Sequence, residues 1–117
     1  MSDDQERGGI RRHVTIKQAA GVPVPEGNLA APVLRHGSLE VEYYAPRGED
    51  QQRPHTRDEV YVVIAGQGTF LNGTERHPFG PGDVIFVPAG VVHRFEEFSD
   101  DFATWVLFYG PEGGEAP

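Results

Sequence analysis

The chain has 117 residues, a formal net charge of -8 and no cysteine, so it has room for one domain and cannot form a disulfide, a thiolate zinc site or an iron–sulfur cluster. Its acidic composition argues against nucleic acid as a partner, because phosphate backbones repel it, and favours a small molecule instead. The first residues contain no apolar stretch typical of a signal peptide, and no run of about 18 apolar residues occurs, so we expect a cytoplasmic protein with no membrane partner.

The two ends of the chain are predicted to be flexible tails, residues 1–13 and 111–117, around one domain of residues 14–110. Within the domain, Thr15 and Gln18 have the spacing of a helical capping box, and Gly21 follows as a stop signal. One short helical turn is therefore expected there. Residues 22–32 contain three prolines, which predicts an irregular extended segment.

The chain from residue 38 onward has the pattern of short β-strands. Residues 39–44 alternate apolar with mainly acidic side chains, residues 59–65 are β-branched and aromatic, and residues 69–71 run into an Asn72-Gly73 hairpin turn. Further strands are expected over residues 84–87, 91–95 and 102–109. Because glycine and proline separate these runs and no crossover helix intervenes, the pattern predicts an all-β, antiparallel sandwich or barrel.

Three residues could form a metal site. His55, Glu59 and His93 supply the two imidazoles and one carboxylate that hold non-haem Fe(II) and also suit Mn, Ni or Zn. On a straight strand, residues 55 and 59 would be about 13 Å apart at roughly 3.3 Å per residue, so the chain must bend between them. Pro54 and the polar residues 56–58 favour a loop that folds over the start of the strand. The remaining histidines are expected to be structural or exposed.

The sequence around these residues resembles the cupin superfamily, whose second motif is G(x)5PxG(x)2H(x)3N. Gly82, Pro88, Gly90 and His93 reproduce its spacing, and Glu97 stands where the family has Asn. This motif is nearly complete.

The first cupin motif, G(x)5HxH(x)3-4E(x)6G, is matched in part. His55, Glu59 and Gly66 correspond to its second histidine, its glutamate and its closing glycine. Arg53 stands at the position of its first histidine, and Gly48 lies one residue later than its leading glycine.

The resemblance implies a single-domain double-stranded β-helix, the cupin or jelly-roll barrel. It also implies that His55, Glu59 and His93 bind a divalent metal, with Fe, Mn, Ni and Zn all open. Gln52 could add a weak fourth oxygen. Arg53 could point outward or pair with a ligand carboxylate. Inward positions near the ligands suggest a pocket lined by four residues: Tyr43, Arg53, Tyr61 and Phe95.

The function expected first is that of a metal-dependent enzyme acting on a small organic molecule. Among the activities of the family, a dioxygenase like quercetinase leads, and an isomerase or lyase follows closely. The alternative is a non-catalytic small-molecule binding or sensor cupin. Separately, the missing histidine could mark a cupin that has given up its metal. A homodimer is expected, in which the apolar segment 14–33 could cross to the partner.

Overall fold

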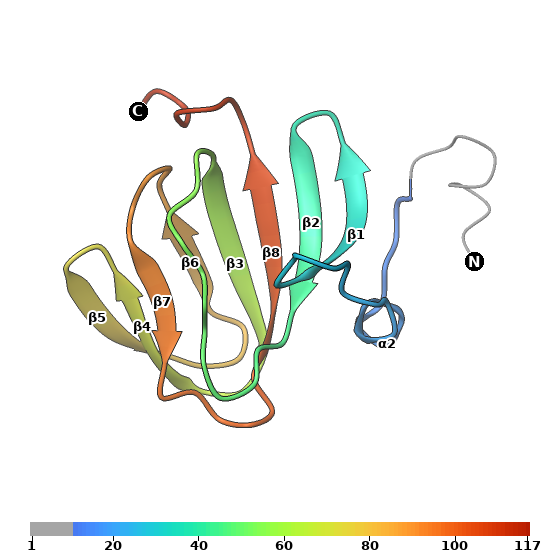
Figure 1. Cartoon of the computed structure of the whole chain (residues 1–117), viewed down its shortest axis with the longest axis horizontal. Helices are drawn as coiled ribbons and strands as arrows, with labels where there is room; N and C mark the ends of the chain where they lie inside the picture. Colours follow the sequence, from blue (N-terminus) through green and yellow to red (C-terminus); the bar gives the residue numbers. More distant parts are fainter. Residues whose placement is uncertain (1–10) are drawn as a thin grey trace.

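The computed structural model describes residues 11–117 (Figure 1). One short helix, α2 (Ile16–Ala20), precedes eight strands in this part of the chain. The strands are β1 (Ala31–His36), β2 (Leu39–Tyr44), β3 (Asp58–Ala65), β4 (Gly68–Asn72), β5 (Glu75–Phe79), β6 (Val84–Val87), β7 (His93–Glu96) and β8 (Ala103–Tyr109). No helix of the described residues is long and apolar enough to cross a membrane.

The strands form two antiparallel sheets that face one another (Figure 1). The larger sheet has the order β1-β2-β8-β3-β6, and the smaller has the order β5-β4-β7. Every neighbouring pair is antiparallel. This architecture confirms the predicted all-β barrel in a single domain.

Aromatic side chains fill the interior between the two sheets. Phe95 packs against Tyr61, Phe70, Phe79 and Phe102, with ring centroids 4.5–5.2 Å apart. Such edge-to-face and tilted contacts suit the charge distribution of the rings. This cluster lies directly beneath the metal-ligand candidates, since both Tyr61 and Phe70 also contact the ring of His93.

Two local expectations are confirmed. Helix α2 begins after Thr15, whose side chain accepts a hydrogen bond from the backbone of Gln18 while the Gln18 side chain accepts one from the backbone of Thr15. The helix ends at Gly21, as expected. At the Asn72-Gly73 turn the chain reverses direction, and β5 pairs with β4 in antiparallel register.

Strand β1 was not expected, because its first two residues belong to the predicted irregular segment 22–32 and no strand was assigned to residues 33–36. The structure places Pro32 near the start of β1, which pairs only with β2 and so forms an edge of the sheet. Proline is tolerated at an edge because a strand there leaves one side of its backbone unpaired.

The C-terminal segment 111–117, predicted to be a flexible tail, is hydrogen-bonded to the loop before β3 and to the first residue of β3. The backbone N–H of Gly113 donates to the carbonyl of Thr56 at 2.6 Å, and the N–H of Glu115 donates to Oδ2 of Asp58 at 2.8 Å. Figure 1 shows this segment returning over the end of the barrel. Most of the other predicted tail, residues 1–13, lies outside the described residues.

Candidate metal centre

The fold brings His55, Glu59 and His93 together at one end of the barrel. His55 lies in the loop before β3, Glu59 is the second residue of β3, and His93 is the first residue of β7. Nε2 of His55 is 2.6 Å from Oε1 of Glu59, and Nε2 of His93 is 3.3 Å from the same oxygen. Each residue offers one ligand atom, and these atoms all lie within 4.8 Å of one another.

The bend that brings His55 back over β3 is held by the turn that precedes β7. The backbone N–H of Gly90 donates to the carbonyl of His55 at 2.7 Å. The N–H of Ala89 donates to Oδ1 of Asp58 at 3.0 Å. Gly90 has φ +80°, a conformation that glycine adopts without strain. The glycine of the second motif therefore positions a ligand contributed by the first.

The backbone sets the direction of both imidazoles. Nδ1 of His55 lies 2.7 Å from the carbonyl of Arg57, and Nδ1 of His93 lies 2.9 Å from the carbonyl of Val91. Because a carbonyl only accepts, each Nδ1 must carry its proton, and in the neutral ring Nε2 is left with a free lone pair. In the neutral rings both Nε2 atoms face Glu59 with a lone pair available for a metal, whereas the 2.6 Å hydrogen bond from His55 to Oε1 of Glu59 forms when Nε2 of His55 also carries a proton.

The charges of the cluster stabilise one another. Burial alone would raise the pKa of Glu59, but the adjacent imidazoles of His55 and His93 lower it overall. Burial alone would lower the pKa of His55, but the hydrogen bond and charge of Glu59 and the carbonyl of Arg57 raise it overall. The cluster therefore keeps an anionic carboxylate at its centre.

Among residues 11–117, two buried atoms of the cluster have no hydrogen-bond partner, Oε2 of Glu59 and Nε2 of His93. The two side chains are 0% and 1% exposed. Leaving a buried polar atom unpaired costs about 1–3 kcal/mol, and a cation bound between these atoms would remove that cost. The donor set of two imidazoles and one carboxylate fits a divalent ion.

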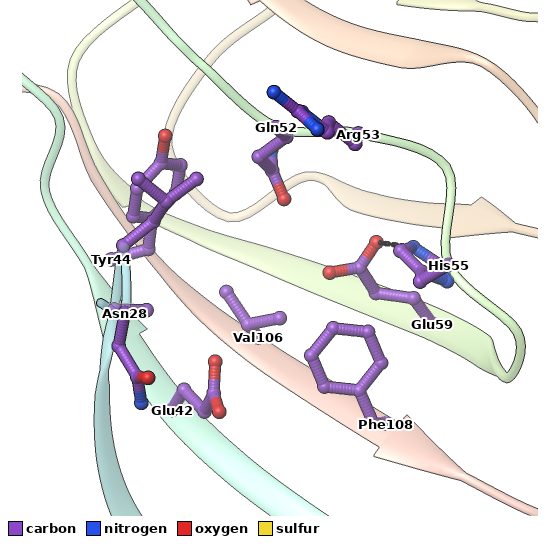
Figure 2. Close-up of a pocket in the computed structure, with 11 residues that line it drawn as sticks. Asn28, Glu42, Tyr44, Gln52, Arg53, His55, Glu59, Val106 and Phe108 are labelled. Atoms are coloured by element: carbon purple, nitrogen blue, oxygen red, sulfur yellow. Dashed lines mark hydrogen bonds and ion pairs between the residues drawn. The ribbon is translucent and has the colours of Figure 1, made fainter.

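A cavity of about 300 Å³ opens beside the cluster (Figure 2). His55 and Glu59 line one side of it, so a molecule in the cavity can reach the ligand atoms. Its other lining residues include polar Glu42 and Gln52 and apolar Val106 and Phe108. This volume lies at the lower end of the range for small-molecule sites.

The residues predicted to line a pocket occupy different places. Gln52 and Arg53 both line the cavity, with Arg53 exposed at its rim. Tyr61 and Phe95 are buried in the aromatic cluster beneath it. Tyr43 does not line it, and its ring packs on Trp105 with centroids 6.0 Å apart.

Tyr44 lines the cavity instead of Tyr43, because successive residues of a strand point to opposite faces of the sheet. The same alternation turns Glu42 into the cavity (Figure 2). The apolar-acidic pattern of residues 39–44 would usually place the acids outside, so no role was predicted for Glu42.

The pKa of Glu42 is raised to about 8, mainly by burial, and further by a hydrogen bond with Glu40 and by the charges of Glu40 and Glu59. The pKa of Glu40 is lowered, first by that hydrogen bond with Glu42 and then by Arg35. At neutral pH Glu42 therefore holds the proton of the pair and shares it with Glu40 in their hydrogen bond.

A second missed residue is Asp50, whose buried carboxylate organises the loop between β2 and β3. It accepts hydrogen bonds from Tyr44, Gln52 and Phe95. No periodicity or family motif marks an acid in a loop that lacks secondary structure, so the sequence offered no signal for it.

Glu97, at the position of the motif's Asn, is exposed and has φ +50°. Asn tolerates this left-handed conformation better than most residues, which gives a backbone reason for that position in the motif.

Comparisons with known proteins agree with this architecture. The family model described as "Cupin domain" matches residues 40–109. An uncharacterized protein of Streptomyces coelicolor is 40% identical over 81 residues, which cover 68% of this chain and 77% of that protein. A structure from Klebsiella pneumoniae, described as an uncharacterized conserved protein with a double-stranded β-helix domain, has a TM-score of 0.63 at 19% identity and covers 85% of this chain and 90% of that one.

Two similar proteins carry the names of enzymes. Dimethylsulfoniopropionate lyase DddQ of Ruegeria pomeroyi is 37% identical over 59 residues, 48% of this chain and 28% of the lyase. Glucose-6-phosphate isomerase of Thermococcus kodakarensis is 30% identical over 92 residues, 74% of this chain and 48% of the isomerase. This chain therefore spans less than half the length of either enzyme.

Proposed function

Because the chain belongs to the cupin domain family, we propose that it is a divalent-metal-dependent enzyme that acts on a small organic molecule. The observation that carries the proposal is the convergence of His55, Glu59 and His93 around two buried atoms without partners, beside an open cavity. Fe, Mn, Ni and Zn all suit this donor set. A bound ion would supply Lewis-acid chemistry, polarising an oxygen of the substrate.

The protein's own residues would hold the substrate and move a proton. Glu42 of β2 pairs with Val106 of β8, and β8 pairs with β3, so Glu42 lies two strands away from the strand of Glu59. At roughly 4.8 Å per strand, the two backbones are about 10 Å apart, which leaves room for a small molecule between the two carboxyl groups. Val106 and Phe108 would form the apolar floor beneath it.

The raised pKa of Glu42, about 8, allows this group to give or take a proton near neutral pH. Isomerases and lyases that act beside a carbonyl or hydroxyl group need such a proton transfer. The names of the two similar enzymes, a lyase and an isomerase, support the same reaction classes. We therefore favour isomerase or lyase chemistry over the dioxygenase expected first from the sequence.

The test is a screen of metal-loaded protein in D₂O, followed by ¹H NMR, with glucose 6-phosphate, dimethylsulfoniopropionate and small hydroxyketones as probes. We expect exchange of a substrate C–H proton or formation of an elimination product. Glu42→Gln should lower kcat by about 10²-fold or more, the usual effect of losing a general acid or base, and should keep its metal. Glu49→Gln, which changes an exposed acid, is the matched control.

If wild type and Glu42→Gln consume oxygen equally with phenolic substrates, the isomerase or lyase assignment is contradicted. The dioxygenase activity would then be the better assignment. The non-catalytic binding cupin also remains a candidate, because an exposed arginine occupies the position of the first histidine. Tight binding of a probe in the cavity without turnover of any probe would favour that alternative.

A further inference from the structure

We propose that Gln52 supplies a fourth oxygen donor to the metal cluster and that Asp50 is the positioning residue that holds it there. The inference rests on the proposed metal centre and deepens it. It also explains how a cupin with arginine at the first-histidine position can keep a four-donor site.

Asp50 is 4% exposed and accepts four hydrogen bonds. Oδ1 accepts from the Tyr44 hydroxyl at 2.5 Å and from the Gln52 backbone N–H at 3.1 Å. Oδ2 accepts from Nε2 of Gln52 at 2.9 Å and from the Phe95 backbone N–H at 2.9 Å. Tyr44 lies on β2 and Phe95 on β7, so this one carboxylate fastens the loop to both sheets. Removing this carboxylate would leave its four donors without their acceptor and would destabilise the protein.

These contacts fix the orientation of the Gln52 amide. Nε2 must face Asp50, because a reversed amide would set its carbonyl oxygen against the carboxylate. Oε1 therefore faces the other way, where it accepts a hydrogen bond from the Tyr61 hydroxyl at 2.7 Å. An amide oxygen has two lone pairs, so one remains available for a cation.

The available lone pair lies on the side of the metal cluster. Tyr61 follows Glu59 by two residues on β3, so both side chains point to the same face of the sheet. Figure 2 shows the amide oxygen of Gln52 directed into the cavity that Glu59 and His55 line, while the Arg53 side chain lies at its rim. The side chain of Gln52, and not that of Arg53, thus points into the cavity beside His55 and Glu59.

The test uses metal alone, so that it needs no substrate. Co²⁺ is titrated into wild type, Gln52→Ala, Asp50→Asn and the double variant, and both affinity and visible absorption are recorded. Removing a residue that orients a ligand typically weakens metal binding about 10–100-fold. We expect that loss in each single variant, a shared change in the Co²⁺ spectrum, and no further loss in the double variant, because Asp50 acts through Gln52.

Two further variants serve as controls for metal binding. Gln51→Ala changes the exposed neighbouring glutamine and should bind Co²⁺ as wild type does. Tyr44→Phe removes one hydrogen bond from Asp50 and leaves those to Gln52, so it should lower the thermal midpoint while keeping the Co²⁺ spectrum. If Asp50→Asn does not fold, Co²⁺ binding by Gln52→Ala alone decides whether Gln52 is a ligand.

Wild-type affinity and spectrum in Gln52→Ala would overturn the inference. Additive losses in the double variant would show that Asp50 does not act through Gln52, and would overturn its positioning role. Wild type that binds no Co²⁺ would instead overturn the proposed metal centre itself, so the two failures are distinct.

Discussion

Glu42 shows how the environment of one residue changes both chemistry and stability. Its pKa is raised from 4.5 to about 8 by burial, by the hydrogen bond and charge of Glu40, and by the charge of Glu59, against the opposing effect of Arg35. Between these two values the folded state holds a proton that the unfolded state has released. The free energy of unfolding contributed by this group is therefore highest below pH 4.5 and falls as pH rises toward 8.

Because of this raised pKa, the stability of the protein should depend on pH through Glu42. Metal-free wild type should lose stability between pH 5 and pH 8 more steeply than Glu42→Gln, as measured by urea unfolding at each pH. The neutral glutamine keeps the shape of the protonated acid and does not titrate. Parallel pH profiles for the two proteins would mean that Glu42 ionises in the fold as it does in the unfolded chain.

The metal-ligand candidates could be found from sequence, whereas their neighbours could not. His55 and Glu59 lie at fixed spacings in the first motif and His93 in the second, so linear positions are enough to select them. Glu42 enters the site only because the β2 register turns it inward, and Asp50 only because a loop closes on β7. Side-chain direction and loop contacts are set by tertiary packing, which no local pattern encodes.

The connection between β3 and β4 leaves no space for a side chain at Gly66. Gly66, the closing glycine of the first motif, has φ +90°, and a Cβ added to it would lie 2.5 Å from Cα of Phe102. That contact is with backbone and cannot be relieved by a rotamer change. The glycine thus lets the chain pass directly over the start of β8.

Gly66→Ala is accordingly expected to lower the free energy of unfolding by about 2 kcal/mol or more, through combined overpacking and left-handed strain. Gly80→Ala is the matched control, because Gly80 has no positive φ and an added Cβ there would contact nothing within 4 Å. Equal stability of the two variants in denaturant unfolding would argue against this packing.

At the level of elements, strands with apolar or alternating runs were predicted, including the edge strands β6 and β7, whereas the edge strands β1 and β5 were not. Strand β5 has a mainly exposed, polar sequence with Pro78 inside it, and β1 begins beside Pro32. Both are edges, where one side of the backbone faces solvent and proline is tolerated. Composition therefore carries little information about them, although the Asn-Gly turn implied that a strand follows β4.

The outer face of the five-stranded sheet is apolar across four strands. Cross-strand pairing sets out two rows on this face, Val84-Val62-Trp105-Tyr43 and Phe86-Val60-Leu107-Val41. Val84 is 70% exposed and Phe86 is 47% exposed. Since the glutamates of β2 point inward, these rows contain no charge, and the same patch on a second copy can pack against it.

We therefore expect the homodimer predicted from the sequence to form through this face. Light scattering coupled to size exclusion should give about twice the 12.9 kDa chain mass for wild type. Val84→Glu with Phe86→Glu should give a single chain, because two desolvated charges per copy oppose association. A wild-type species of 12.9 kDa would rule out the dimer, and a dimer that survives both substitutions would point to another surface, such as residues 14–33.

The central claim is that His55, Glu59 and His93 form a metal site, and metal content measured by plasma mass spectrometry tests it most directly. The protein is purified without a tag or chelator, reconstituted in turn with Fe(II), Mn, Ni and Zn, and compared with His55→Ala, His93→Ala and the exposed control His77→Ala. We predict about one equivalent in wild type and His77→Ala, and little in the two ligand variants. A wild type that takes up none of these metals, or a full complement in His93→Ala, would contradict the account.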